Sequence, residues 1–263
     1  MASNEQIVRE NYQDGREEGR ATASRYAQLE FFYTEEHIRE YIRRDTAVLE
    51  VGCGTGYYAL QFAGRCREYV GVDITPANIA LFNEKVRAQG LTNARGQVGD
   101  ATDLREIADG SFDVVLCLGP LYHLPPPERE LVFAECRRVC KDQGIAAFSY
   151  INRVGVYAGA CVHDTSREIY PNETANKRVL VQGRDDVRPD LFFYTMPEEI
   201  EALAQKYGFS KRKNLGTDFF VTMSAIEAMS DEQFAAMKPL LDQMTSHESC
   251  TGMSNHALLV CQK

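Results

Sequence analysis

The sequence predicts an α/β protein built on a doubly wound, mostly parallel sheet. Two observations support this: short apolar runs alternate with helix-like segments at the spacing of βαβ units, and the apolar runs are nearly continuous. Strands of a parallel sheet are covered on both faces, so they lack the polar alternation of a half-exposed strand. A chain of 263 residues is long enough for one large domain that carries a smaller cap.

The predicted elements follow one another in a regular order. Strands are expected at residues 47–51, 69–73, 97–100, 112–118, 145–151, 209–220 and 256–261. Helices are expected at 24–44, 57–63 and 75–90, at a short stretch between 101 and 108, and at 127–144, 197–208 and 222–246. This rhythm breaks between residues 152 and 195, where glycine, proline and aromatic residues mix.

Three parts of the chain are therefore expected. Residues 1–44 form an N-terminal arm and helix that act as a lid. Residues 45–151 and 196–263 form the main domain, and residues 152–195 form an inserted cap or substrate segment.

Composition narrows the class of protein. A net charge of −9 and a pI of about 5.2 disfavour a nucleic-acid partner. Eight cysteines without a CxxC pair predict reduced thiols and no metal site. We find no signal peptide, and no apolar run approaches the ~18 residues that would span a membrane. A cytoplasmic protein without a membrane partner, a monomer or a homodimer, is expected.

The strongest motif is the glycine-rich turn after the first predicted strand, VLEVGCGTG at residues 48–56. Gly52, Gly54 and Gly56 allow a tight turn and a close approach of backbone to a ligand. The third glycine comes one residue too early for a dinucleotide fingerprint. Glu50, two residues before the first glycine, would disfavour a pyrophosphate and favour a cationic amino group.

Two further acids end the next strands. Asp73 is placed to accept hydrogen bonds from both ribose hydroxyls of a nucleoside, and the neighbouring Ile74 can pack on an adenine face. Asp100, followed by Ala101, can accept a hydrogen bond from the exocyclic amine of adenine. Because the strands are parallel, these acids should meet at one edge of the sheet.

Four motifs in order, VLEVGCGTG, VGVDI, VGDA and FDVVLCLGPLYHL, give the chain its family resemblance. It resembles the class I S-adenosylmethionine-dependent methyltransferases, and LGPLYHL with the polar arm looks like a bacterial small-molecule subgroup. The resemblance implies a Rossmann-like, seven-stranded sheet in which residues 256–261 form one antiparallel strand near the edge.

The same resemblance implies a set of cofactor contacts. Glu50, Gly52, Gly54 and Gly56 would line the methionine part of S-adenosylmethionine, and the backbone of Leu118 and Gly119 would meet its amino group. Asp73 would bind the ribose, while Asp100 and Ala101 would meet the adenine.

The polar arm suggests further contacts. Tyr12, Arg16 and Arg20 are predicted to close over the cofactor, with one of the arginines pairing with its carboxylate. A charged tail without such contacts is the alternative.

For catalysis, His123 is the candidate general base and Tyr122 the residue that orients the acceptor. The alternative for His123 is a structural loop residue held by backbone groups. His163 and Asp164 in the cap are weaker candidates. The tetrapeptide GPLY lacks the first Asn or Asp of the Pro-Pro-Tyr motif, which counts against amide or exocyclic-amine acceptors.

The function predicted is methyl transfer from S-adenosylmethionine to a small-molecule acceptor by in-line displacement, with S-adenosylhomocysteine as product. The alternatives are a non-catalytic or regulatory nucleotide-binding protein of the same fold, an NAD-dependent oxidoreductase, and an RNA or protein methyltransferase.

Overall fold

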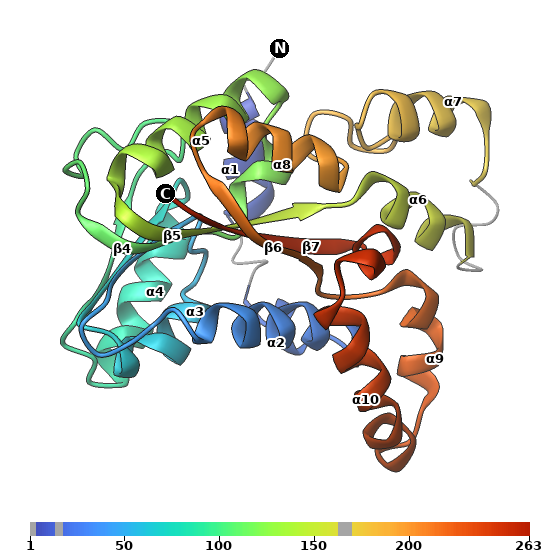
Figure 1. The fold of residues 1–263 in the computed structure, drawn as a ribbon, viewed down its shortest axis with the longest axis horizontal. Coiled ribbons are helices and arrows are strands. Elements are labelled where there is room, and N and C mark those ends of the chain that lie inside the picture. Colours follow the sequence, from blue (N-terminus) through green and yellow to red (C-terminus); the bar gives the residue numbers. More distant parts are fainter. Residues whose placement is uncertain (1–3, 14–17, 163–169) are drawn as a thin grey trace.

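A seven-stranded sheet forms the centre of the computed structural model, which describes residues 4–13, 18–162 and 170–263 (Figure 1). Its strand order is β3-β2-β1-β4-β5-β7-β6. The bounds are β1 Ala47–Val51, β2 Glu68–Asp73, β3 Ala94–Val98, β4 Phe112–Cys117, β5 Cys140–Ile151, β6 Ser210–Gly216 and β7 His256–Gln262. Only β7 in this sheet is antiparallel to its neighbours, β5 and β6. The predicted fold class is confirmed.

Helices cover both faces of the sheet, because neighbouring strand residues point to opposite sides. Val48 packs in the layer formed by α2 Arg25–Arg39, α3 Tyr57–Phe62 and α4 Pro76–Ala88. Leu49 packs in the layer formed by α5 Pro126–Val139 and α8 Pro197–Lys206. Figure 1 shows these two layers on either side of the strands.

Short elements complete the chain around these layers. The amino-terminal part contributes α1 Asn4–Tyr12, the 3-10 turn η1 Arg20–Thr22 and, after α3, η2 Ala63–Arg65. Towards the carboxyl end lie η6 Phe220–Thr222, α9 Met223–Ala228, α10 Asp231–Ser246 and η7 Glu248–Met253. Leu29 and Tyr33 of α2 form a separate apolar cluster with Ile226 and Leu241, so α9 and α10 buttress α2.

Residues 152–195 carry α6 Arg153–Val162, α7 Glu173–Ala175 and the π-helical turn η5 Asn176–Val181. The end of this segment lies against η3 Pro120–His123, the turn that follows β4. The amide of Phe193 donates to the carbonyl of Tyr122 over 2.8 Å, and that of Thr195 donates to Ile151 over 3.0 Å. This pairing ties residues 191–195 to the loop that carries His123.

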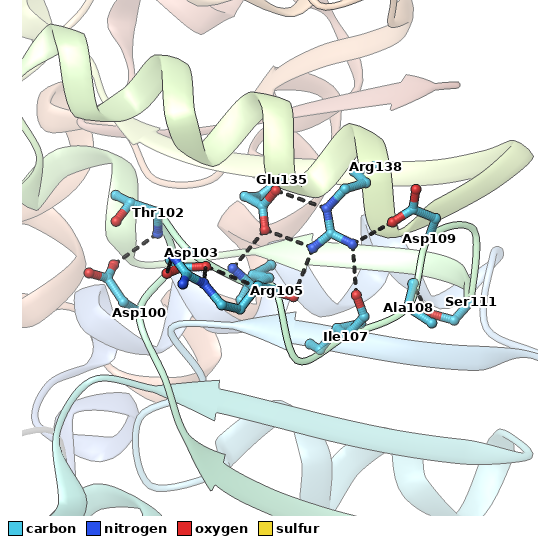
Figure 2. A network of polar contacts seen from close by, with 11 residues as sticks. Asp100, Thr102, Asp103, Arg105, Ile107, Ala108, Asp109, Ser111, Glu135 and Arg138 are labelled. Carbon is cyan, nitrogen blue, oxygen red and sulfur yellow. Dashed lines mark hydrogen bonds and ion pairs between the residues drawn. The ribbon is translucent and has the colours of Figure 1, made fainter.

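The short helix expected between residues 101 and 108 is absent, and a loop held by side chains takes its place. Arg138 of α5 donates to the carbonyls of Leu104 and Ile107 over 2.8 and 2.7 Å and to Asp109 over 2.7 Å (Figure 2). Glu135, which pairs with Arg138, also accepts the amide of Leu104 over 2.7 Å. These contacts satisfy the backbone groups that a helix would have paired internally.

Two predicted helices also have different bounds. The helix expected at 127–144 ends at Val139, because the chain turns directly into β5 at Cys140. The helix expected at 222–246 is two helices, since Ser230 caps a new one by accepting the amide of Gln233 over 3.2 Å.

Arg129 fixes the loop after β4 from inside α5. Its side chain is buried, and its guanidinium donates to the carbonyls of Leu121, Leu124 and Phe193 over 2.7, 2.9 and 2.7 Å. Burial lowers the pKa of Arg129 to about 10, so the group still carries its charge at neutral pH. One side chain therefore joins α5, the loop after β4 and residues 191–195.

All eight cysteines are free thiols. Within the described ranges, no helix has the length and apolar character needed to cross a membrane, and no cluster of ligating side chains is arranged to hold a metal ion.

Candidate active site

A cavity with a volume of about 390 Å³ lies at the carboxyl ends of β1, β2 and β4. That is the edge at which open α/β sheets bind ligands. Of the predicted site residues, the cavity wall includes Tyr12, Arg20, Glu50, Gly52, Gly54, Asp73, Ile74, Asp100, Ala101, Leu118, Gly119, Tyr122 and His123. Gly56 is not part of this wall, so its expected contact with the ligand has no support.

The glycines of the turn are needed by the fold itself. Gly52, Gly54 and Gly56 have φ of 76°, 51° and 92°, a region that residues with a Cβ rarely adopt. A Cβ on Gly52 would lie 2.5 Å from Cδ of Pro120, and a Cβ on Gly56 would lie 2.7 Å from Cδ2 of Phe82. Gly56 is therefore a packing residue that lets α4 approach the turn.

Asp73 joins the glycine turn to the start of α4. One carboxylate oxygen accepts the amide of Gly54 over 2.9 Å, and the other accepts the amide of Thr75 over 2.8 Å and Nδ2 of Asn78 over 3.2 Å. Asn78 also lines the cavity, and its buried Oδ1 has no hydrogen-bond partner among the described residues. An unpaired buried acceptor beside a carboxylate suits a ligand that brings hydroxyl donors.

Glu50 is buried below the turn and lines the same cavity. Its Oε2 accepts the hydroxyl of Tyr69 over 2.7 Å. Burial raises the pKa of Glu50 to about 8, against the opposing effect of that hydrogen bond. The side chain is therefore largely protonated at neutral pH, and a nearby cation would favour its ionised form.

Asp100 lies at the start of the loop shown in Figure 2, where its Oδ1 accepts a hydrogen bond from the amide of Thr102 over 2.8 Å. Burial raises the pKa of Glu128, and the charge of Asp100 adds to this effect. Both acids line the cavity, with Ala101 between Asp100 and Thr102.

His123 is held as a neutral base in the turn after β4. Its Nδ1 lies 2.9 Å from the carbonyl of Leu191, which can only accept, so Nδ1 carries the hydrogen. Burial lowers the pKa of His123 from its ordinary value of 6.5 to about 4. Nε2 thus keeps its lone pair at neutral pH, and it accepts the hydroxyl of Tyr12 over 2.9 Å.

Aromatic rings surround this imidazole. The rings of Tyr12, Tyr122 and Phe192 lie 5.2, 4.8 and 5.0 Å from it, measured between centroids. The hydroxyl of Tyr122 donates to the carbonyl of Leu118, directly after β4, over 3.4 Å.

Arg20 has a partner other than the one predicted. Its guanidinium pairs with Glu30 over 2.6 Å and lies over the ring of Phe31, 5.2 Å from the centroid. Arg20 still lines the cavity, so the predicted pairing with a cofactor carboxylate would compete with Glu30. Arg16, His163 and Asp164 lie outside the described residues.

A buried cluster of ionisable side chains, which the sequence analysis did not predict, lies next to Arg20. His256 Nδ1 is 2.7 Å from Asp218 and 3.6 Å from Glu30. Burial lowers the pKa of His256, but the carboxylates of Glu30 and Asp218 outweigh burial, so the pKa is raised. Sequence spacing predicts no contact among residues 30, 218 and 256, because they come from three distant segments.

The comparisons with known proteins agree with this geometry. Residues 48–144 match a family model described as "Methyltransferase domain". The ubiquinone biosynthesis O-methyltransferase of Methylococcus capsulatus is 35% identical over 105 residues, which are 40% of this chain and 43% of that one. The chain thus covers less than half the length of this relative.

Two solved structures share the fold. The cyclase SpnF has a TM-score of 0.64 at 16% identity, covering 100% of this chain and 97% of that one. A SAM-dependent methyltransferase from Methanosarcina mazei has a TM-score of 0.57 at 19% identity, covering 86% and 96%.

Residues 48–144 are therefore similar to the methyltransferase domain family, and the solved structures show that the whole sheet shares their fold. The cyclase in this set shows that the fold alone does not fix the reaction. The reaction depends on the residues that line the cavity.

The state of His123 can be measured directly. In ¹⁵N-histidine NMR spectra, its imidazole is expected to titrate near pH 4, with the hydrogen on Nδ1 and the lone pair on Nε2 above that pH, because burial disfavours the charged ring. His123→Gln assigns the signal. A midpoint near 6.5, or the hydrogen on Nε2, would contradict this arrangement.

Proposed function

We propose that the chain is a methyltransferase that moves a methyl group from S-adenosylmethionine to a small-molecule acceptor. The observation that carries the proposal is that one cavity is lined both by acids at the carboxyl ends of successive strands, Glu50, Asp73 and Asp100, and by the neutral imidazole of His123. The volume of about 390 Å³ is in the range of small-molecule sites.

The wall of the cavity suits the methyl donor. Asp73 and the unpaired Oδ1 of Asn78 would accept hydrogen bonds from the ribose hydroxyls. Ile74, Ala101 and Asp100 would bind the adenine.

Glu50 and the backbone of Leu118 and Gly119 would hold the methionine part. When bound, S-adenosylmethionine supplies a methyl group already activated by a sulfonium, so the protein mainly aligns the reactants.

His123 is the proposed proton acceptor. The carbonyl of Leu191 fixes the tautomer in which Nε2 keeps its lone pair, and Tyr122, which also lines the cavity, would orient the acceptor. The name of the Methylococcus relative, an O-methyltransferase, is consistent with a hydroxyl acceptor whose proton must leave. The net charge of −9 favours a small acceptor over RNA. A cytoplasmic monomer or homodimer remains part of this proposal.

Cofactor binding tests the proposal first. Isothermal titration with S-adenosylhomocysteine should give micromolar affinity, with no heat from NAD. Asp73→Asn keeps the shape of the side chain but removes carboxylate acceptors, so it should weaken binding by roughly tenfold or more.

Asp142→Ala is the matched control, since the Asp142 side chain is 92% exposed and lies outside the cavity wall. Equal affinity of the Asp73→Asn variant and the wild type, or binding of NAD in place of S-adenosylhomocysteine, would refute the cofactor assignment. Binding without transfer to any acceptor would favour the regulatory alternative.

The affinity for S-adenosylmethionine should depend on pH through Glu50. Below its pKa of about 8, Glu50 must release a proton before it can pair with the cationic ligand. Affinity should therefore rise from pH 6 to 8, by up to about tenfold per pH unit.

Titrations in two buffers of different ionisation enthalpy would detect that released proton. Glu50→Gln, which cannot ionise, should bind with affinity independent of pH in this range. Proton release that persists in this variant would show that another group is responsible.

A further inference from the structure

Helix α1 brings the phenol group of Tyr12 into contact with His123, the proposed proton acceptor of the cavity. Tyr12 is the last residue of α1, and its hydroxyl donates to Nε2 of His123 over 2.9 Å. Its ring meets the imidazole edge-on at 5.2 Å, with an interplanar angle of 73°. The nitrogen that is free to accept a proton is therefore covered by a hydroxyl of this chain's own arm.

The hydrogen bond at Nδ1 and the rings around the imidazole fix the orientation of His123. Nδ1 donates to Leu191, and Tyr122 and Phe192 pack against the ring. An external hydroxyl that gave its proton to this base would have to occupy the place now taken by the hydroxyl of Tyr12.

Helix α1 has no buried residue, and at its other end Asn4 donates to the carbonyl of Asp190 over 3.0 Å. Displacing one neutral hydrogen bond costs little net free energy when an incoming hydroxyl replaces it. Two contacts of α1 lead to residues 190–191, one directly from Asn4 and one from Tyr12 through His123, so the helix lies beside this part of the cavity.

We propose that Tyr12 occupies the acceptor site as a built-in stand-in for a phenolic substrate, and that α1 moves aside when a phenol binds. This inference rests on the proposed function and adds the acceptor class. An aromatic ring with one acidic hydroxyl reproduces what Tyr12 presents to His123, within a site walled by aromatic rings.

The acidity of the acceptor hydroxyl also favours phenols over aliphatic alcohols. A phenol loses its proton near pH ~10, as tyrosine does, whereas water and hydroxyls like it require about 16. A weakly basic imidazole can assist only the more acidic hydroxyl. In the transfer, the phenol oxygen bonds to the methyl carbon, the carbon–sulfur bond breaks with its electron pair on sulfur, and the proton goes to Nε2 and then to solvent. The products are an aryl methyl ether and S-adenosylhomocysteine.

The test measures phenol binding by calorimetry, with and without saturating S-adenosylhomocysteine. Tyr12→Ala vacates the site, so phenol should bind at least tenfold more tightly than to the wild type. Tyr12→Phe keeps the ring in place and should show no such gain. The double variant Tyr12→Ala/His123→Ala should lose the gain, and cyclohexanol should not reproduce it.

Tyr57→Ala is the matched control, because Tyr57 also lines the cavity but its ring packs against Phe31 at 4.7 Å. It should produce no gain that depends on His123. Circular dichroism checks that each variant is folded.

Three results would overturn the inference: equal phenol affinity in the wild type and Tyr12→Ala, a gain that survives removal of His123, or a gain shared by cyclohexanol. A more than tenfold loss of S-adenosylhomocysteine affinity in Tyr12→Ala would instead assign Tyr12 to the cofactor. Failure of the wild type to bind S-adenosylhomocysteine would refute the proposed function, whatever phenol does.

Discussion

The guanidinium of Arg129 holds together the part of the molecule on which the chemistry depends. The loop after β4 has no regular hydrogen-bond ladder, yet it is buried, so its carbonyls need donors. Arg129 supplies them to Leu121, Leu124 and Phe193 at once. With that loop and residues 191–195 fixed to each other, the carbonyl of Leu191 can fix the orientation of His123. The defined tautomer of the His123 imidazole thus depends on the buried guanidinium of a neighbouring helix.

The cofactor side of the cavity rests on a different group. Asp73 accepts hydrogen bonds from the glycine turn and from the start of α4, so the same carboxylate that is proposed to bind ribose also sets the shape of the turn. Glu50, protonated beneath the turn, gives the site a negative charge only when a cation is present. The proposed cofactor side of the cavity therefore combines the fixed hydrogen bonds of Asp73 with the carboxyl group of Glu50, whose charge depends on the ligand.

Local patterns were sufficient to predict the strands, most helices and several of the acids that line the cavity, whereas the antiparallel strand was implied by the family resemblance. These predictions failed where side chains from a distant segment, and not backbone groups nearby in the sequence, hold the chain in place. Residues 101–108 have a helix-like composition, but Arg138 and Glu135 of α5 hold them as a loop, and such contacts have no sequence period. Gly56 was assigned to the ligand, whereas its neighbour is Phe82. The pairing of Tyr12 with His123 and the cluster of Glu30, Asp218 and His256 join segments far apart in the chain, so no spacing could predict them.

The proposed function requires that one cavity hold the methyl donor and the acceptor base together. The decisive measurement is a crystal structure of the complex with S-adenosylhomocysteine. We expect the ribose hydroxyls on Asp73, the adenine beside Asp100, and the sulfur facing the side of the cavity where Nε2 of His123 lies. Adenosine bound elsewhere, or a sulfur turned away from His123, would contradict it.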